Sequence, residues 1–454
     1  MEAHNDFTEG NILTSLLHFV VPVLFALFLQ AMYGAVDLLV VGQFASSADV
    51  SAVATGSQLM QTVTNLISSL ATGTTVLLGQ KIGEKKPRDG SRITGASLCL
   101  FGIIGLLFTV GLSVFAGPLA SLMNAPLEAF GLTRSYIRIC GGGAAVVLAY
   151  NLIGSVFRGL GVSATPFYTV AIACVSNILG DLLLVAVFHM GAAGAAIATV
   201  LAQLLSVVIS VHLIRKKQLP FTLRREDFHF EHAIIRRVLS LGIPLAVQDI
   251  LVGSSFLIIL ALVNNLGVVP SAGVGVAEKV CGFVMLVPAA FMQSMSAFTA
   301  QNCGAGRMDR ALRGLFTAIA VSFLCGCVMG WLAFFHGAVL AGIFSKAPDV
   351  TAAAADYLKA YALDCLLTSF FFCFIGFFNG LGLTKFVMFQ GIAGALGVRV
   401  PVSYLMSLRR PVSLFHIGLA TPCSSLLQLL LCFCCMYFLK KHGRFSDKMP
   451  HSPE

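Results

Sequence analysis

The sequence predicts an all-α integral membrane protein with twelve transmembrane helices in two six-helix lobes. Of its 454 residues, 57% are hydrophobic and only 11% are charged. A soluble domain carries about 25% charged residues, so this composition excludes an ordinary soluble protein. The apolar residues form a series of stretches of about 20 residues, the length that a hydrocarbon core of about 30 Å requires of a helix. Short sequence elements also recur between the two halves at a nearly constant offset.

Each apolar stretch is expected to be helical, because a backbone exposed to lipid has no water with which to form hydrogen bonds. The predicted spans of the first half are 14–41, 51–78, 93–115, 134–157, 165–188 and 193–214. The predicted spans of the second half are 238–263, 272–299, 311–335, 357–379, 384–407 and 413–438. The predicted domains are an N-terminal lobe (1–214), a basic cytoplasmic linker (215–237), a C-terminal lobe (238–440) and a cytoplasmic tail (441–454).

The Lys and Arg residues predict the orientation in the membrane. The segments that follow even-numbered spans, including the tail, carry 21 of the 29 Lys and Arg residues. Because cytoplasmic loops are enriched in these residues, we expect a multi-pass protein of the plasma (inner) membrane with both termini in the cytoplasm. The net charge of +9 is then explained by the Lys and Arg residues of the cytoplasmic segments. No nucleic-acid partner is expected, because the basic residues are spread over many loops.

Three pairs of elements match between the halves. They are "FRGLG" (157–161) with "FNGLG" (378–382), "GQKIGE" (79–84) with "AQNCGA" (300–305), and Pro22 with Pro244. The offset is 221 residues for the first two pairs and 222 for the prolines. An even number of spans separates equivalent elements, which predicts two lobes related by a pseudo-twofold axis along the membrane normal. Transporters often bind substrate between two such repeats.

The first span contains a carboxylate, Asp37, within the apolar stretch "AMYGAVDLLVVGQF". On a helix, Gln30, Tyr33, Gly34 and Asp37 share one face. Ionisable residues inside a membrane usually mark a transport pathway, so Asp37 is predicted to take up and release a cation, and Gln30 and Tyr33 to line a substrate cavity. Pro22 and Gly34 are candidate hinges, since Pro and Gly are common sites of helix kinks. A structural acid bonded to a neighbouring Tyr or Asn is the alternative interpretation of Asp37.

The fifth span supplies two further polar residues, Asn177 and Asp181, which are four residues apart and therefore share a helix face. With Asp37 they would supply hard oxygen ligands for Na⁺. The two acids could instead share a proton, because like charges held close together resist ionising at the same time. The residue types leave both options open, together with a purely structural clasp between the first and fifth spans.

The second half has its own charged residues within predicted spans. Asp249 and Asp364 are candidates for the substrate cavity, where an acid would attract a cationic compound, although structural pairing is an equal alternative. Arg399 is expected to pair with Asp364, because unpaired charges are expensive in lipid. A structural role is expected for Glu278 and Lys279. The offset of 221–222 places the counterpart of Asp37 at Ile258 or Ile259, and those of Asn177 and Asp181 near Val398 and Val402. The polar cluster is therefore expected only in the first lobe.

The order of these elements, "P…DLLVVGQF…GQKIGE…FRGLG…N…GD", resembles the multidrug and toxic compound extrusion (MATE) transporters over residues 14–438. The resemblance implies export of cationic amphipathic compounds in exchange for protons or sodium ions. It also places Asp37, Asn177 and Asp181 at the polar positions that this family uses for cation coupling. Some members carry a Glu in the seventh span. Here Val252 stands at that place, so a second-lobe sodium site of that kind is not expected.

Other classes of function are less consistent with the sequence. The chain has no P-loop "GxxxxGK[ST]", so an ion gradient is the expected energy source. No enzyme activity, cofactor or oligomer is predicted; the expected partners are small cationic molecules and membrane lipid. A flippase for lipid-linked precursors is one alternative, but such cavities are typically basic. A membrane-embedded transferase is the other, but the loops lack the clustered acids that hold Mg²⁺ in such enzymes.

Overall fold

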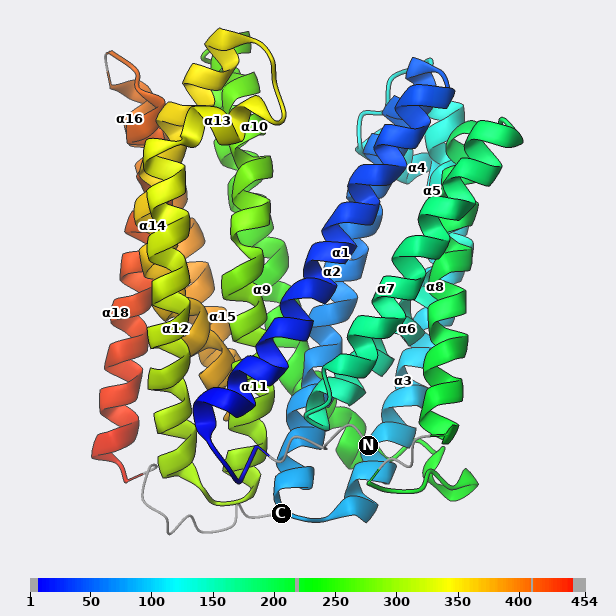
Figure 1. Cartoon of the computed structure of the whole chain (residues 1–454), viewed down its shortest axis with the longest axis vertical. Helices are drawn as coiled ribbons and strands as arrows, with labels where there is room; N and C mark the ends of the chain where they lie inside the picture. Colours follow the sequence, from blue (N-terminus) through cyan, green and yellow to red (C-terminus); the bar gives the residue numbers. More distant parts are fainter. Residues whose placement is uncertain (1–6, 217–219, 410, 444–454) are drawn as a thin grey trace. The chain divides into compact units, whose positions relative to one another are not determined.

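The computed structural model describes residues 7–216, 220–409 and 411–443, and every regular element within these ranges is a helix (Figure 1). The first half contains α1 (Ile12–Phe44), α2 (Ser47–Gly83), α3 (Pro87–Val114), α4 (Ala116–Leu122), α5 (Phe130–Gly142), α6 (Ala144–Gly159), α7 (Ala164–Asp181), η1 (Leu182–Val187) and α8 (Gly191–Lys216). The second half contains η2 (Arg225–Asp227), α9 (His232–Asn264), α10 (Val268–Val284), α11 (Leu286–Gly304), α12 (Met308–Phe335), α13 (Gly337–Gly342), α14 (Pro348–Gly380), α15 (Thr384–Gly394), η3 (Ala395–Arg399), α16 (Val400–Leu408), α17 (Leu414–Gly418) and α18 (Ala420–Lys441).

Most of these helices have the length and composition of membrane spans. Within the described residues, ten helices or continuous helix pairs are apolar enough to cross a membrane, and the pair α5–α6, bent by 51°, makes an eleventh. The helix α2 has 37 residues and is therefore long enough for a twelfth. Polar side chains lower its hydropathy, among them Gln61, whose Nε2 donates to Asn65 Oδ1 at 2.9 Å.

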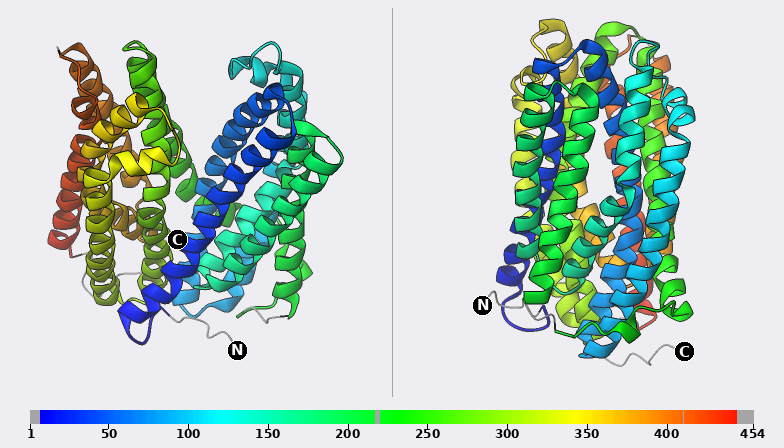
Figure 2. Two further views of the ribbon diagram at one scale, coloured as in Figure 1. Left: turned by 45° about the horizontal axis from the view of Figure 1, so that its top comes forward. Right: turned by 90° about the vertical axis from the view of Figure 1, so that its right-hand side faces the viewer.

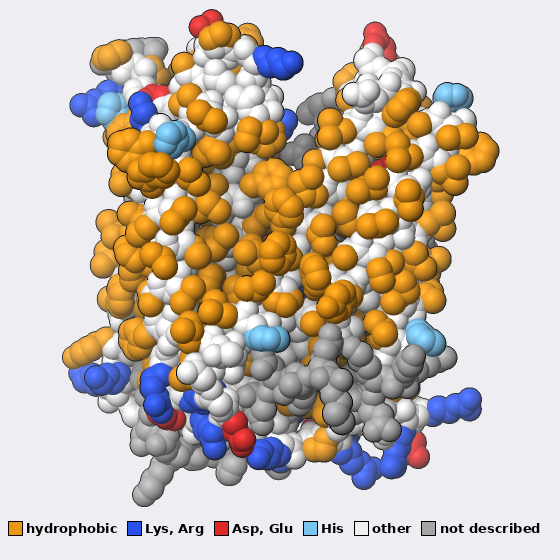
Figure 3. Space-filling model, viewed as in Figure 1, with side chains coloured by type: hydrophobic (Ala, Val, Ile, Leu, Met, Phe, Trp, Pro, Cys, Tyr) orange, Lys and Arg blue, Asp and Glu red, His pale blue; other side chains and the backbone are white. Residues whose placement is uncertain are grey.

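The surface has the pattern expected for contact with lipid. Figure 3 shows hydrophobic side chains over the middle of the helices, whereas Lys and Arg gather toward the helix ends. Large apolar side chains such as Leu107, Val187 and Leu324 are strongly exposed. In water, contiguous apolar surface of this extent would drive aggregation, whereas in a bilayer it is solvated by acyl chains.

The chain folds into two compact units, and Figure 2 shows that the helices within each unit run side by side. Unit 1 comprises Val21–Ile243, and unit 2 comprises the described residues 7–20 together with those from Pro244 onward. Two helices, α1 and α9, therefore contribute to both units. The border falls beside Pro22 in α1 and at Pro244 in α9. A proline inside a helix removes a backbone hydrogen bond and favours a kink, and both prolines occupy equivalent positions in the repeat.

The domain boundaries deduced from the sequence stay predictions. Within them, positions 217–219 of the linker and 444–454 of the tail lie outside the described residues. The rest of the linker packs on unit 1. Arg92 of α3 holds Glu231 through two hydrogen bonds of 2.7 and 3.1 Å.

The start of the described chain packs inside unit 2. Phe7 is fully buried, with its ring 5.1 Å from that of Phe19 and 5.4 Å from that of Phe298. The guanidinium of Arg310 donates to the carbonyl oxygens of Phe7, Glu9 and Gly10 at 2.7, 2.5 and 2.8 Å. These bonds satisfy backbone groups that precede the first helix and have no helical partner of their own.

Two glycines allow α2 and α9 to cross closely within unit 1. A Cβ atom on Gly73 would lie 2.3 Å from the carbonyl oxygen of Val238, and one on Gly242 would lie 2.5 Å from that of Leu70. Both obstacles are backbone atoms, which cannot rotate away. The Gly242→Ala variant is therefore expected to lower the free energy of unfolding by about 1–3 kcal/mol.

The measurement is the melting temperature (Tm) of the purified protein in detergent. Gly102→Ala is the matched control, because a Cβ atom on Gly102 meets nothing within 4 Å. Equal Tm values for the two variants would show that the close crossing of α2 and α9 is not required for stability.

Candidate cation site

Four polar side chains from three helices meet inside unit 1. Asp37 comes from α1, Asn177 and Asp181 from α7, and Thr199 from α8. Asp37 is 4% exposed, Asn177 is 1% exposed and Asp181 is fully buried. The structure thus brings together the three residues that the sequence analysis had grouped, and adds a threonine to them.

Thr199 links Asp37 to Asn177. Its hydroxyl lies 3.3 Å from Asp37 Oδ2 and 2.9 Å from the carbonyl oxygen of Ala195, so one proton has two acceptors within reach. The Nδ2 group of Asn177 donates to the same hydroxyl oxygen at 3.4 Å. The hydroxyl therefore holds α1, α7 and α8 in register around the two acids.

Several oxygen atoms of this cluster have no hydrogen-bond partner in the structure. They are Asp37 Oδ1, Asn177 Oδ1 and both carboxylate oxygens of Asp181. The carboxyl groups of Asp37 and Asp181 are close enough to affect each other electrostatically. Burying an unpaired carboxylate is very costly, so two of them side by side require a proton or a bound cation. The free oxygen atoms form a donor set of the hard type that Na⁺ prefers and that a proton can equally neutralise.

The local structure explains how α7 presents Asp181. The α-helix ends at this residue, and the chain continues as the π-helical turn η1. Such turns are frequent at functional sites. Gly180 allows α7 to approach α8 closely, since a Cβ atom there would lie only 3.0 Å from Ala198 Cβ. Asp181 is therefore held against α8 at a point where the helix geometry changes.

A buried apolar core of unit 1 shares the helices α1 and α8 with the cluster. Its members include Val41, Val53, Tyr136, Cys140 and Val185, all buried in one contiguous core. This core keeps the local dielectric constant low, which strengthens every electrostatic interaction within it.

The sequence analysis missed Thr199, which contacts the cluster, and two neighbouring polar residues of unit 1, Tyr136 on α5 and Gln203 on α8. A signal for two of them was present, because Thr199 and Gln203 lie four residues apart within the apolar span 193–214 and therefore share a helix face. Tyr136, in the stretch before "GGG", carries no comparable signal.

The other polar residues of the first span contact neighbouring helices of unit 1. The Nε2 group of Gln30 donates to the hydroxyl of Tyr150 on α6 at 2.8 Å. Tyr33 interacts with Gln203 on α8 and with Asp37. Both Gln30 and Tyr33 are half-buried, and their role in a substrate cavity stays a prediction.

The charged residues of unit 2 occupy different environments. Asp249 is exposed on α9, whereas Asp364 on α14 is 1% exposed and Arg399 at the end of η3 is 5% exposed. The guanidinium of Arg399 donates to Ser255 Oγ at 3.1 Å and lies over the ring of Phe256, 4.3 Å from its centre. Asp364 and Arg399 attract each other electrostatically, but no direct ion pair joins them in the described structure.

Two more charged residues lie on α10. Glu278 is half-buried and its Oε1 atom has no hydrogen-bond partner, whereas Lys279 is exposed. Within the part of the chain that the structure describes, no three His, Cys, Asp or Glu residues are placed to hold a metal ion together. The unit 1 cluster, built from two acids, an amide and a hydroxyl, offers the hard oxygen donors that suit a light cation and lacks the soft ligands of a transition-metal centre.

A comparison with known protein families supports the predicted internal repeat of the two halves. The family model MatE matches residues 22–183 and again 244–405. The two matches are offset by 222 residues at both ends, which pairs Asn177 with Arg399 and Asp181 with Ser403.

Among curated proteins, the chain is 28% identical over 401 residues to "Probable multidrug resistance protein YpnP" of Bacillus subtilis (strain 168), covering 88% of this chain and 86% of that protein. It is 22% identical over 412 residues to "Multidrug export protein MepA" of Staphylococcus saprophyticus, covering 88% of each.

Solved structures match over nearly the whole chain. A structure described as "Crystal structure of MATE in complex with MaL6" gives a TM-score of 0.91 at 17% identity, covering 97% of this chain and all of that one. Another, "Outward-facing conformation of a multidrug resistance MATE family transporter of the MOP superfamily", gives 0.90 at 18% identity, covering 97% and 99%. The predicted all-α membrane fold with twelve helices in two lobes is confirmed.

Proposed function

Because this chain belongs to the MatE family, we propose that it is a secondary active antiporter that exports cationic amphipathic compounds in exchange for protons or sodium ions. The observation that carries the proposal is the buried cluster of Asp37, Asn177 and Asp181 with its unpartnered oxygen atoms. A fixed structural clasp would be expected to satisfy these atoms. A site that binds and releases an ion in each transport cycle needs oxygen atoms that are available to that ion. The names of the curated relatives support multidrug export as the cargo class.

The proposed mechanism uses the charge of the two acids. A proton or sodium ion that binds between Asp37 and Asp181 neutralises them, so that α1 and α7 can repack. The helix α1 would bend near Pro22 or Gly34, where kinks are favoured. Release of the substrate follows if cation and substrate bind preferentially to different states, as thermodynamic linkage requires of any exchanger.

The substrate side of the proposal rests on two acids of unit 2. Asp249, exposed on α9, and the more buried Asp364 are the candidates to attract a positively charged compound. We expect the protein to work as a monomer in the plasma membrane, with both termini in the cytoplasm and without a cofactor or catalytic activity.

The test uses purified protein in liposomes and a fluorescent cationic dye. Dye movement is recorded under a pH gradient alone and under a sodium gradient alone, with protein-free liposomes as the control. We expect one of the two gradients to drive transport, and that gradient identifies the coupling ion. Absence of dye movement under both gradients would overturn the proposal and favour the lipid-linked flippase.

Thr199 offers a graded test of the same site. Thr199→Val keeps the shape of the side chain but removes the hydroxyl that contacts both Asp37 and Asn177. Since a hydrogen bond contributes about 0.5–1.5 kcal/mol, we expect the half-saturating concentration of the coupling ion to rise by about two- to tenfold. The measurement is dye transport as a function of ion concentration. Thr199→Ser retains the hydroxyl and should stay close to wild type; equal shifts in both variants would contradict a role for the hydroxyl.

A further inference from the structure

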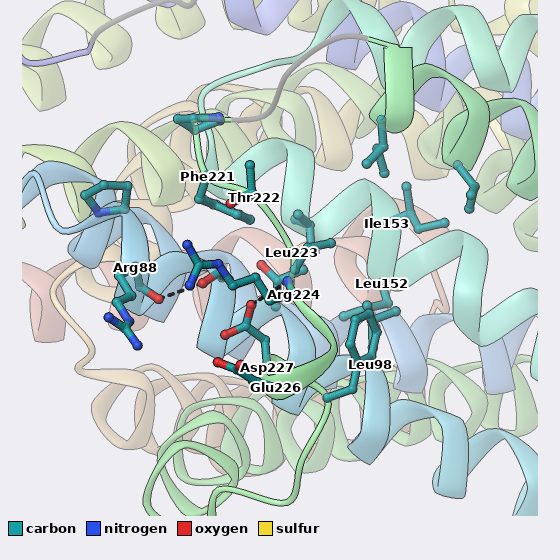
Figure 4. A pocket seen from close by; sticks show the side chains of 18 residues that line it. Arg88, Leu98, Leu152, Ile153, Phe221, Thr222, Leu223, Arg224, Glu226 and Asp227 are labelled. Atoms are coloured by element: carbon teal, nitrogen blue, oxygen red, sulfur yellow. Dashed lines mark hydrogen bonds between the residues drawn. The ribbon is translucent and has the colours of Figure 1, made fainter.

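Unit 1 contains a large cavity that shares no lining residue with the candidate cation site. It has a volume of about 970 Å³ and is lined by residues of α3, α6, α8 and the segment 220–228 (Figure 4). Small-molecule sites in proteins usually measure about 300–1,000 Å³, so this cavity can hold a sizeable ligand. None of Asp37, Asn177 or Asp181 lines it.

The lining is divided between polar and apolar residues. Figure 4 shows Arg88, Arg224, Glu226 and Asp227 toward one end, and apolar side chains toward the other. The apolar lining residues include Leu98, Leu152, Ile153, Val156, Val211 and Ile214. A cavity with one charged end and one apolar end can bind both the polar and the apolar part of an amphiphilic molecule.

The segment over the cavity is fixed by specific contacts. The Asp227 carboxylate accepts a hydrogen bond from the backbone N–H of Arg224 at 2.8 Å. A Cβ atom on Gly95 would lie 2.1 Å from the carbonyl oxygen of Asp227, so α3 and this segment touch backbone to backbone. The ring of Phe221 is buried against Gly90 of the same helix. The wall of the cavity is therefore built by tertiary packing on α3.

The cavity lies near the end of the helices at which α3 begins and α8 ends, where lipid headgroups are expected. The helix α3 begins at Pro87 and α8 ends at Lys216, in the Lys- and Arg-rich segments that predict the cytoplasmic face. Its apolar lining extends along α3 as far as Leu98 and includes Leu152, Ile153 and Val156 of α6. Basic pockets between transmembrane helices on this side are typical binding sites for lipid headgroups.

We propose that this cavity binds one glycerophospholipid whose headgroup carries both a phosphate and an ammonium group, as in phosphatidylethanolamine. The acyl chains contact Leu152, Ile153 and the neighbouring apolar lining. Arg88 and Arg224 bind the phosphate, for which the arginine fork is well suited. Glu226 binds the ammonium group. The two signs of charge at one end favour a zwitterion over a purely anionic lipid, and the Asp227 carboxylate is already engaged by the backbone of Arg224.

The test is native mass spectrometry of the full-length protein released from micelles after incubation with phosphatidylethanolamine, phosphatidylglycerol or phosphatidylcholine. We expect one phosphatidylethanolamine to be retained in preference to the other two. The Arg88→Gln/Arg224→Gln variant should weaken retention of one lipid about tenfold, because it removes charge-assisted hydrogen bonds. Glu226→Gln should abolish the preference for phosphatidylethanolamine over phosphatidylglycerol.

The matched control is Arg236→Gln/Arg237→Gln, which removes the same charge from exposed positions of α9 in unit 1 that do not line the cavity. Equal losses in the control and the cavity variant would overturn the proposal, since they would reveal general attraction of lipid to positive charge. The Ile153→Trp variant fills the apolar end without a change of charge, and undiminished retention there would also overturn it.

Two further outcomes decide the class of ligand. Displacement of the lipid by inorganic phosphate at millimolar concentration would show that the cavity recognises the phosphate alone. Retention of the cationic dye in place of lipid would assign the cavity to transport cargo. Either result would replace the phospholipid assignment.

Discussion

Asp37→Asn is expected to reduce ion-driven dye export to less than about a tenth of the wild-type rate, while the protein still folds. The substitution removes the charge that the coupling ion would neutralise but keeps the size of the side chain and its ability to accept a hydrogen bond from Thr199. A loss of about 1.4 kcal/mol of transition-state stabilisation already gives a tenfold change in rate. Removing the charge of one of the two carboxylates proposed to bind the ion is expected to cost more than this amount of energy.

The measurement compares transport and folding in the same preparation. Dye export is recorded in liposomes under the active gradient, and Tm is recorded in detergent. Asp349→Asn serves as the control, because Asp349 is exposed in the first turn of α14 and far along the chain from the cluster. Wild-type export by Asp37→Asn would remove the residue from the coupling site and leave the structural clasp as its role.

Asp181→Asn is expected to behave like Asp37→Asn, and the double variant should lose little more than either single one. Residues that act as one unit give non-additive effects. Additive losses from two variants with measurable residual transport would instead indicate two independent roles.

The second large effect concerns the stability of unit 2. Arg399→Gln is expected to lower the free energy of unfolding by about 1–3 kcal/mol, because it removes a buried guanidinium that donates to Ser255 Oγ and attracts Asp364 without a direct ion pair. Asp364→Asn should cost a similar amount by leaving Arg399 uncompensated. The double variant Asp364→Asn/Arg399→Gln should be more stable than the sum of the two single effects indicates, since neither charge remains.

This double-mutant cycle is measured by thermal unfolding in detergent. Arg134→Gln is the control, because this arginine is exposed on α5 in unit 1. Additive effects in the cycle would show that Asp364 and Arg399 do not stabilise each other, in line with the absence of a direct ion pair between them. The Ser255 hydroxyl and the Phe256 ring would then account for the stability of the buried guanidinium.

The sequence predicted the fold well because membrane helices are encoded locally. Each span is an apolar stretch of a length set by the bilayer, and the repeat required only matching short elements. The acids of the candidate site were also visible, since a carboxylate such as Asp37 is conspicuous within an apolar segment. Thr199 was harder to identify, because threonine is common in membrane helices and only its contact with Asp37 distinguishes it.

A difference of one residue in the offset between the two repeats changes which residues of the second half correspond to the candidate site. An offset of 221 assigns Val398 to the position of Asn177, whereas the offset of 222 in the family match assigns Arg399. The motifs on which the smaller offset depends lie after the second, fourth, eighth and tenth spans, so they do not fix the register within the fifth and eleventh. The π-helical turns η1 and η3 also shift side chains relative to a regular α-helix. The second lobe therefore contains a fixed positive charge at a place where the sequence analysis found only apolar residues.

The membership of residues 7–20 in unit 2 could not be predicted from chain order. Local composition indicates that α1 crosses the membrane but says nothing about the unit in which its start is packed. The contacts of Phe7 with Phe298, and of Arg310 with three backbone carbonyls, join residues 291 to 303 positions apart. Pairings at that separation are determined by the tertiary structure alone.

The start of α1 packs in unit 2, and the start of α9 packs in unit 1. This arrangement has a consequence for biogenesis. Domains usually fold as units, the N-terminal one first, while the ribosome is still at work. Here the earliest part of the chain belongs to the later unit, so residues 7–20 must wait until α11 and α12 have been synthesised. Unit 1 likewise remains incomplete until the first turns of α9 have entered the membrane. Nascent chains that stop after α8 should therefore expose unfinished surfaces to the insertion machinery and be recognised by membrane proteases, whereas chains that extend through α18, and so contain all helices of both units, should resist them.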